Sequence, residues 1–523
     1  MPPKITLFVI KFCIFLGGVG AFNAVFAQCS TSGDPVSITG TNCPNVAITT
    51  NKSEVTVQSG AYIGTTAWLP NPALLIQNAT VENLKNSSLI QGQTTNTSGI
   101  QVDGTTVVKN LNNAAQISGA LYAIQLTGSG SIATINNTGS IYNNGNNAVA
   151  QGIFMSTAGG STSIGAINNS GAINGSAGAI YLDTASGSNT ASIGTINNSG
   201  SINGGQDAGI LVGTGNTINV INNNSGGDIR AGACNGLTCY NSIRNWGTIN
   251  EINNLGNIAG STGYGFTGYG IENNGLIKTV NNAQTNLTYT GVLPTNYNII
   301  INSASNYGKT TFSNVSGGPL TFGFGSGSAI SRSGTYADVL SGLTAQNLAN
   351  TSGSLGGGIV LTQWVLSNTS GTNWSLTTTP GTPVAPAVPN SFAATKLAAA
   401  LTVAYSAVAS GGANPTLSNG TSLAGAVQGL TTSQVNQLVN VHAEGYSSNM
   451  TIGLEQMGHI TNTVMDRIHA PMAASASTKV YQDDEGRYVW VDAAAVKGTV
   501  NNYNNLAGFG YNLYDLIIGG DIK

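Results

Sequence analysis

A motif of one apolar residue and two asparagines, best seen in "TINNSG" from Thr195, recurs along the first half of the chain. Its apolar residue returns about every 28 residues, a spacing typical of solenoids with loops of varying length. Around each motif, apolar residues fall into three short clusters divided by Gly, Asn and Ser, which suits strands and is too short for amphipathic helices. The pattern predicts an all-β solenoid, a right-handed parallel β-helix. The motif positions are Leu84, Leu111, Ile135, Ile167, Ile196, Ile221, Ile252 and Val280.

The corner after each motif, Asn-Asn-Ser-Gly at residues 197–200 in one coil, has to turn sharply. Asn and Gly tolerate positive φ, so we expect left-handed backbone at this corner. Asparagines stacked on neighbouring coils can also hydrogen-bond along the solenoid axis, as side-chain amides do in cross-β stacks. With isoleucines filling the interior, eight coils at a spacing of about 4.8 Å predict a rod of roughly 40 Å.

The composition limits the possible partners. The chain has 523 residues, 7% of them charged, and a formal net charge of -3. It therefore offers no basic patch for nucleic acid, and no cofactor is predicted. Apolar residues make up 41% of the chain and stand at regular places, which favours an ordered fold over disorder.

The N-terminus has the features of a secretory signal peptide. A positively charged start is followed by an apolar run, which ends with the small residues Val25 and Ala27 before Gln28. We expect cleavage between Ala27 and Gln28. The apolar run is too short to span a bilayer comfortably as an anchor. Gln28 in front of Cys29 also disfavours a lipoprotein.

Four cysteines remain once the signal peptide is removed. An oxidising compartment favours two locally closed disulfides, Cys29 with Cys43 and Cys234 with Cys239, over free thiols. A metal site would need further soft ligands close by, and no histidine precedes His442. We therefore predict disulfides and no metal site.

Two charged features near the C-terminus also lack the spacing of a metal site. The acidic stretch "YQDDEGR" at 481–487 resembles a calcium ligand cluster in composition but not in spacing. His442, His459 and His469 are too far apart in sequence for a local metal motif. We interpret the acidic stretch as a solvated entry to a strand.

The pattern changes after the repeat. Strand-like sequence with Trp364 and Trp374 is expected to cap the open solenoid end, whose edges would otherwise pair with other chains. Beyond a proline-rich boundary, Thr431 begins a capping box, and apolar residues from Met450 to Ile468 follow at helical spacing. The chain ends in a predicted β-hairpin. The predicted division is 1–27 signal peptide, 28–305 β-helix, 306–380 β cap, 381–424 Pro/Ala/Gly-rich linker, 425–480 helical region and 481–523 terminal strands.

This order of parts resembles the monomeric autotransporters of Gram-negative bacteria, a type V secretion family. The resemblance covers nearly the whole chain in architecture. It is most specific over 425–523, where the helical sequence precedes "YVWVDAAAVKGTV" and "GFGYNLYDLIIGGDI". It implies that the terminal strands begin an outer-membrane β-barrel, that the helix near Met450–Ile468 occupies its pore, and that the cap is an autochaperone-like folding template.

The resemblance also implies a location and partners. The implied partners are the outer membrane and the barrel-assembly machinery, and the implied location is the outer membrane and cell surface. The family's barrel has about a dozen strands, and a membrane barrel must close so that every backbone group is paired. About two predicted strands precede Lys523. We therefore expect a fragment or a truncated product, and a genuine truncation would remain in the periplasm.

The predicted function is that of an autotransporter precursor, not an enzyme, whose monomeric passenger acts as an adhesin or surface structural protein. Exposed Ser, Thr and Asn side chains would meet host or matrix glycans or proteins. The alternative is a secreted β-helix enzyme that degrades polysaccharides, which needs two converging acids. Asp183, Asp207 and Asp228 fall about one coil apart, and we interpret them as solvated loop residues rather than a stack. A trimeric autotransporter would need heptads and four strands per subunit, and neither is found.

Overall fold

The structure, a computed structural model, describes most of the chain between Cys29 and Pro380 and part of the C-terminal region. The described residues are 29–65, 71–93, 96–145, 149–236, 238–331, 333–355, 362–380, 452–458, 460–463, 465, 478–482, 487–500 and 509–522. The chain divides into two compact units, one containing everything through Ser352 together with Val365–Thr377, and the other containing Gly353–Trp364 and everything from Thr378. The predicted cleavage site at Ala27 and Gln28 lies outside the described residues.

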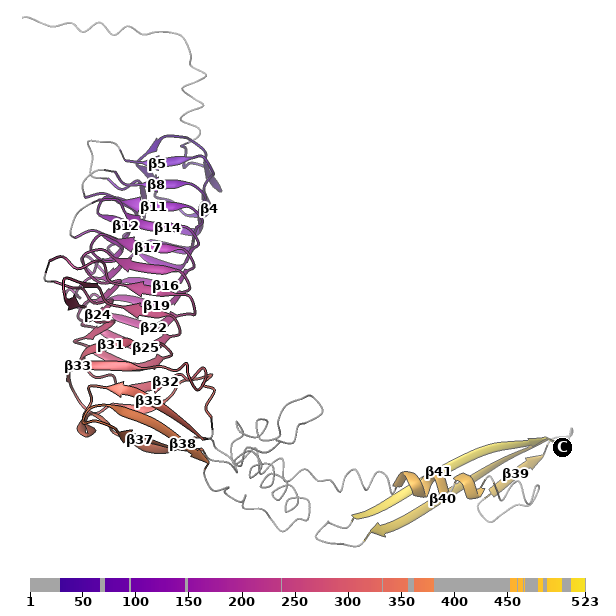
Figure 1. The fold of residues 1–523 in the computed structure, drawn as a ribbon. Coiled ribbons are helices and arrows are strands. Elements are labelled where there is room, and N and C mark those ends of the chain that lie inside the picture. Colours follow the sequence, from indigo (N-terminus) through magenta and orange to yellow (C-terminus); the bar gives the residue numbers. More distant parts are fainter. Residues whose placement is uncertain are drawn as a thin grey trace, which may run out of the picture. The chain divides into compact units, whose positions relative to one another are not determined.

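The first unit is a parallel β-helix, as the repeat predicts, and its coils stack along one axis (Figure 1). Each complete coil contributes one strand to each of three faces. The first face is a sheet of twelve strands: β1 (Val36–Ile38), β4 (Lys52–Val57), β7 (Thr80–Asn86), β10 (Val107–Asn113), β13 (Ser131–Asn137), β16 (Thr162–Asn169), β19 (Ala191–Asn198), β22 (Thr217–Asn223), β25 (Thr248–Asn254), β30 (Leu276–Asn282), β32 (Asn296–Ile299) and β34 (Thr321–Phe324).

The second face is shorter and the third is longer. The second has nine strands: β2 (Cys43–Pro44), β5 (Tyr62–Gly64), β8 (Leu89–Gln91), β11 (Gln116–Gly119), β14 (Ser140–Asn143), β17 (Ala172–Gly175), β20 (Ser201–Gly204), β23 (Asp228–Arg230) and β26 (Asn257–Ala259). The third has fifteen, in spatial order: β3 (Val46–Ile48), β6 (Leu74–Gln77), β9 (Ser98–Asp103), β12 (Tyr122–Leu126), β15 (Gln151–Met155), β18 (Ile180–Leu182), β21 (Ile210–Val212), β24 (Ile243–Asn245), β29 (Ile271–Asn273), β31 (Leu287–Val292), β33 (Thr310–Ser316), β35 (Gly334–Ser341), β38 (Trp374–Pro380), β37 (Thr362–Asn368) and β36 (Ser352–Leu355).

All eight motif positions predicted from the repeat lie in one row of directly paired, buried residues on the first face. The row has twelve members, so the β-helix is longer than the repeat indicates, about 50 Å at the usual strand spacing. Two of the additional members precede Leu84, and two follow Val280. The row is Val36, Val55, Leu84, Leu111, Ile135, Ile167, Ile196, Ile221, Ile252, Val280, Tyr297 and Phe322.

The second asparagine of the motif forms the predicted ladder inside the β-helix. Each side-chain amide donates to the carbonyl oxygen of the equivalent asparagine in the next coil toward the C-terminus, over 2.7–3.1 Å. All the side chains of this inner ladder are at most 2% exposed. In most coils the same amide nitrogen also donates to a backbone carbonyl that opens the next coil's second-face strand. The members are Asn86, Asn113, Asn137, Asn169, Asn198, Asn223, Asn254 and Asn282.

The first asparagine of the motif forms an outer ladder on the opposite side of the same strands. Here each amide donates toward the N-terminus, to the preceding coil, over 2.6–2.8 Å. The two ladders therefore run in opposite directions. The members of the outer ladder are Asn112, Asn136, Asn168, Asn197, Asn222, Asn253, Asn281 and Asn298.

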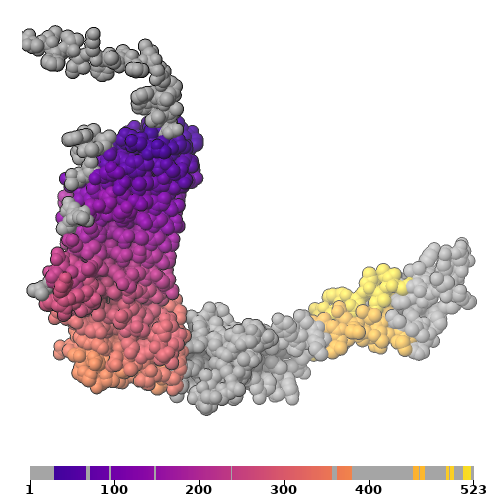
Figure 2. Space-filling model, turned by 45° about the horizontal axis from the view of Figure 1, so that its top comes forward, coloured from indigo at the N-terminus to yellow at the C-terminus, as the bar shows by residue number. Residues whose placement is uncertain are grey.

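The prediction of left-handed backbone at the Asn-Asn-Ser-Gly corner is wrong at residues 168–171 and 197–200, and is confirmed at 223–226, where Gly226 has φ of 84°. The corner glycines Gly139, Gly171 and Gly200 have φ outside the range +20° to +160°. They are needed for space instead, because a Cβ on Gly200 would lie 2.1 Å from the backbone oxygen of Gly171, and one on Gly171 would lie 2.1 Å from that of Gly139. Successive coils thus approach closely at this corner. The coils form one continuous packed column in the space-filling view (Figure 2).

Aromatic residues fill the C-terminal coils of the β-helix. The ring centroid of Phe312 lies 5.3 Å from that of Tyr289 and 5.9 Å from that of Tyr297. The Tyr297 ring also lies 6.3 Å from that of Phe322. The predicted cap residue Trp374 is 4% exposed and donates from its indole nitrogen to the Leu343 carbonyl over 2.7 Å. A short 3-10 helix, η1 (Ala345–Asn347), lies in this region.

The second unit contains the predicted helix and terminal strands. Residues 452–458, 460–463 and 465 are helical. β40 (Arg487–Val500) and β41 (Phe509–Ile522) form the predicted antiparallel hairpin, and a third strand, β39 (Thr478–Gln482), pairs with β40. This third strand, "TKVYQ", is too short and polar to be distinguished in the sequence. Thr431 and its capping box lie outside the described residues.

Candidate functional site

One row of outward-facing side chains crosses the third face along the solenoid axis. Strand register sets the row, since each member pairs with the equivalent residue of the next coil. Side chains alternate across a strand, so the buried residues on either side of each member place the row outside. Aromatic, apolar and charged residues succeed one another: Gln101, Gln125, Phe154, Tyr181, Leu211, Arg244 and Glu272.

Two rings of this row, Phe154 and Tyr181, form a stack with Tyr122, which lies in β12 outside the row. Tyr122 and Phe154 are nearly parallel, at an interplanar angle of 8° and a centroid distance of 4.3 Å. Tyr181 follows at 5.8 Å from Phe154, tilted by 40°. Burial, and then the negative charge of Asp183, raise the pKa of Tyr122 and of Tyr181. Asp183 therefore lies close enough to both phenols to act on them.

Arg244 is the charged centre of the row. Its Nη1 atom lies 2.6 Å from Asp207, its Nε atom lies 2.9 Å from Glu272, and its guanidinium stands 4.5 Å from the ring centroid of Trp246. Burial lowers the pKa of Arg244, but the two carboxylates outweigh it and the pKa is raised. For Glu272, burial acts in the other direction and raises the pKa. The hydrogen bond from Asn241 and the charge of Arg244 outweigh it and hold the pKa below its ordinary value.

A hollow of about 350 Å³ lies between Tyr181 and Arg244. Leu211 occupies the register position between them and is only 6% exposed. The shorter side chain thus leaves a gap in the row, with the Tyr181 ring on one side and the Arg244–Trp246 pair on the other. Thr184, Thr214 and Asp207 also line the hollow.

The three acids that fall one coil apart in sequence do not stack. Asp207 pairs with Arg244, while Asp228 pairs with Arg230 at 2.6 Å on the second face. Asp183 accepts a hydrogen bond from the backbone of Thr184. Asp207 is more than a solvated loop residue, because its carboxylate helps to fix the guanidinium beside the hollow.

Sequence reasoning missed Tyr181, Arg244 and Trp246 as site residues. The available signal was the residue directly after the first isoleucine of each third-face strand, in "IFM", "IYL", "ILV", "IRN" and "IEN". Aligning the strands of this face, rather than those with the Asn-Asn motif, brings these positions into one row.

Both predicted disulfides are present. Cys29 is bonded to Cys43 with a Cα–Cα distance of 5.4 Å, and Cys234 to Cys239 with 4.3 Å. The first connects the residues before β1 to the second face. The second closes a loop between β23 and β24, outside the coil.

A small hairpin lies beside the Cys234–Cys239 loop. Its strands are β27 (Thr262–Gly263) and β28 (Phe266–Thr267), and the sulfur of Cys234 lies 3.5 Å from the hydroxyl of Ser261. Tyr264 at its turn is 75% exposed and has φ of 53°, and Phe266 is 46% exposed. The hairpin therefore presents two aromatic side chains to solvent.

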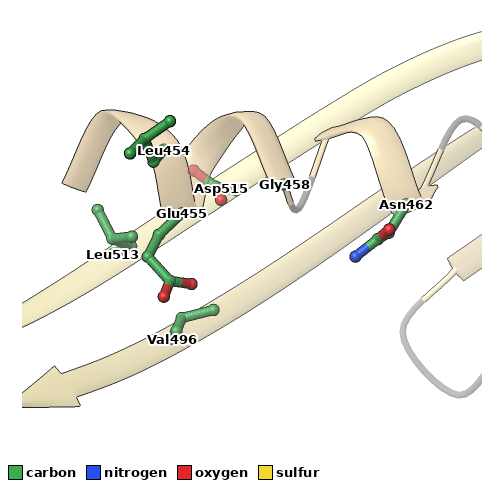
Figure 3. Close-up of a pocket in the computed structure, with 7 residues that line it drawn as sticks. All are labelled: Leu454, Glu455, Gly458, Asn462, Val496, Leu513 and Asp515. Carbon is green, nitrogen blue, oxygen red and sulfur yellow. The ribbon is translucent and has the colours of Figure 1, made fainter. Parts of the chain in front are cut away.

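In the second unit, a pocket of about 480 Å³ lies between the helix and the hairpin (Figure 3). Glu455 points from the helix toward the strands, and Val496, Leu513 and Asp515 line the opposite side (Figure 3). The predicted apolar face of the helix is not buried among the described residues, since Leu454 is 62% exposed and Met457 is 68% exposed.

The helix brings polar side chains to the strands because two strand carboxylates lie there, among the apolar Val496 and Leu513. Asp492 of β40 is 5% exposed and accepts a hydrogen bond from the Thr463 hydroxyl over 3.3 Å. Asp515 of β41 lies on the same side of the hairpin. A carboxylate in such a position needs a polar partner, and the helix supplies one.

Within the described ranges, no group of three or more His, Cys, Asp and Glu side chains is placed to hold a metal ion. His442, His459 and His469, and residues 483–486 of the acidic stretch, lie outside these ranges. Of the helices in the described part of the chain, none is both long and apolar enough to cross a bilayer. No protein-family profile, characterised protein or solved structure matches the chain.

Proposed function

We propose that this chain is an exported surface protein of the autotransporter type, in which the β-helix is a passenger that acts as an adhesin-type binding module. The C-terminal strands would anchor it in the outer membrane. The alternation of side chains along β40 and β41 carries the proposal. One side of the hairpin is apolar and exposed over its middle, and the side toward the helix carries two carboxylates among apolar residues.

The exposed side is apolar over its middle. Tyr514, Leu516 and Ile518 of β41 are 79%, 66% and 64% exposed. Ala493 of β40 pairs with Leu516 and is also exposed. The same side becomes polar at one end, where Lys497 and Asn512 pair in register.

The opposite side carries Asp492 and Asp515 beside the helix. An exposed apolar outer side, with carboxylates on the inner side, is typical of strands that face lipid on one side and a polar lumen on the other. In water, three adjacent exposed apolar side chains would be an aggregation hazard. The alternation therefore supports insertion in a membrane.

A binding role for the passenger has more support than a catalytic role. Asp207 and Glu272 both bind the guanidinium of Arg244. Carboxylates held in this way suit the role of hydrogen-bond acceptors that orient a ligand. Cleavage of a glycosidic bond needs one carboxyl group as an acid and another as a base or nucleophile. We therefore propose host or matrix glycans or proteins as partners of the β-helix.

Protease treatment of intact cells of the producing bacterium tests the export. We expect the β-helix to be cleaved from outside while a periplasmic marker stays protected. Protection of the β-helix on intact cells would contradict the proposal.

A matched pair of variants tests the anchor. Leu516→Arg should sharply reduce the amount at the surface, because a cation in the middle of a lipid-facing strand costs about 2–4 kcal/mol. Asn512→Arg, on the same side of the same strand but at its polar end, should have little effect. If Leu516→Arg is displayed as well as the parent, the exposed side does not face lipid.

A further inference from the structure

We propose that the hollow between Tyr181 and Arg244 binds one neutral pyranose ring of a glycan. The inference rests on the proposed role of the β-helix as a binding module and names the chemistry that this module recognises.

The spacing of the coils sets the width of the site. Tyr181, Leu211 and Arg244 occupy the same register position in three successive coils. Two strand spacings separate the outer two, about 9.6 Å. Carbon atoms make contact at about 3.5–4.0 Å, so contacts on both sides leave room for the thickness of one puckered ring and not for two. Leu211, only 6% exposed, forms an apolar floor.

The Tyr181 ring supplies a stacking surface. Phe154 packs against one side of this ring at 5.8 Å, and the ring also lines the hollow. The stack with Phe154 and Tyr122 limits the rotation of the ring, so little side-chain entropy is lost when a ligand binds. The C–H groups of a pyranose face are apolar and suit an aromatic face.

The polar groups around the hollow match sugar hydroxyls. A hydroxyl both donates and accepts a hydrogen bond, and here Arg244 donates while the Asp207 carboxylate accepts. The threonine hydroxyls of Thr184 and Thr214 can do either. Glu272 and Trp246 hold the guanidinium from its other sides, so the site is oriented before the ligand arrives.

The charge around the hollow selects a neutral ring. Asp207 and Glu272 together exceed the single charge of Arg244. Asp183 adds further negative charge, since it acts on the Tyr181 phenol. Sugars with a carboxylate or sulfate would meet repulsion, which disfavours acidic glycans.

The test is binding of the full chain, purified in detergent, to an array of neutral and acidic glycans of animal, plant and bacterial origin. We expect binding to neutral glycans above acidic ones, and the origin of the bound glycans identifies the source. Tyr181→Ala should weaken binding by about tenfold or more, because the stacking surface is lost. Tyr181→Phe keeps the ring and should retain binding. Tyr142→Ala, a half-exposed ring on the second face, is the matched control and should leave binding unchanged.

A second variant fills the hollow without touching the core. Thr214 is exposed in the loop after β21 and lines the hollow, so Thr214→Trp should abolish binding while the thermal midpoint stays unchanged. Binding that survives Thr214→Trp, a preference for acidic glycans, or no binding to any glycan would each overturn the inference. If protease cleaves the β-helix on intact cells but no glycan on the array is bound, the export proposal stands and only this binding site is rejected.

Discussion

Two stretches of the same β-helix fill the same interior in different ways. Between Leu84 and Val280 the interior repeats almost identically, with isoleucine in one row and the inner asparagine ladder in another. From Leu287 onward, tyrosine and phenylalanine take over the isoleucine row, and the asparagine ladder ends. The ladder position of Asn282 is followed in register by Ile299 and then Phe324. The pairing of the first face continues in register across the junction, so this face tolerates either kind of interior.

The difference between the two interiors shows why the sequence repeats from coil to coil in only one of them. An amide in the inner ladder needs an amide of the same length above and below it, because a buried donor or acceptor without its partner costs about 1–3 kcal/mol. Apolar interiors require volume and shape but not identity. A polar ladder therefore imposes the same residue on every coil, and an aromatic interior does not.

The junction itself is bridged by hydroxyl groups. Asn282 has no further asparagine to bind and donates instead to the Tyr297 hydroxyl at 3.3 Å and to the Thr310 hydroxyl at 3.2 Å. The hydroxyls of Tyr297 and Thr310 lie 2.7 Å apart. The Tyr297 hydroxyl thus adds to the partners of the last ladder amide, which also donates to the Gln284 carbonyl over 2.9 Å.

The largest expected effect is in the aromatic stretch. Phe322→Ala removes a ring that is 2% exposed, and should lower the free energy of unfolding of the full chain by about 3–5 kcal/mol. Phe324→Ala, next to it and half-buried, should lose clearly less. Urea unfolding followed by circular dichroism measures both. Equal losses would mean that burial does not distinguish the two rings.

The next effect is in the inner ladder. Asn198→Leu keeps the shape of the side chain but leaves Asn169 without its acceptor and Asn223 without its donor, at a cost of about 3 kcal/mol. Asn197→Leu, in the outer ladder of the same strand and half-exposed, should cost under about 1 kcal/mol. The same urea unfolding measures them. A tolerated Asn198→Leu would show that the ladder stretch behaves like the aromatic one.

A smaller effect depends on pH and belongs to the junction. Burial raises the pKa of Tyr297 to about 12, although hydrogen bonds from Thr310 and Asn282 oppose it. Because the folded pKa lies above the ordinary value, the stabilisation is complete below about pH 10 and is lost as the pH rises through about 12, by between about 2 and 3 kcal/mol.

Thermal midpoints between pH 8 and 12 test this. The parent should lose more stability over this range than Tyr297→Phe, which has no phenol to ionise and starts less stable at neutral pH by about 1 kcal/mol. Tyr142→Phe, on the second face, should follow the parent. Parallel curves for the parent and Tyr297→Phe would place the alkaline loss elsewhere.

The same contrast explains what sequence alone could predict. The strand period, the eight coils and the axial asparagine bonds follow from residues that the inner ladder forces to be identical. The coils at Tyr297 and Phe322 are in register with the others but lack the complete motif, so the repeat in the sequence does not reveal them. The corner glycines Gly171 and Gly200 were recognised for the wrong reason, since contact between coils is not visible in one coil's sequence.

The candidate site was harder to predict because it depends on the outward row of another face. Tyr181 and Arg244 are far apart in sequence, and each looks like an ordinary exposed residue. Only the register of β18, β21 and β24 brings them to the two sides of Leu211. The disulfides were predictable because each closes locally, within 14 and 5 residues.

The opposite directions of the two asparagine ladders have an electrostatic consequence. Aligned amide groups add their dipoles, as peptide units do along a helix, and a single ladder of this length would place partial charges of opposite sign at the two ends of the solenoid. Here the amides of Asn86 through Asn282 point one way and those of Asn112 through Asn298 the other. Their axial fields cancel. Coils can therefore be added to such a stack without creating an electrostatic potential difference between its ends. The amide dipoles then attract counter-ions to neither end.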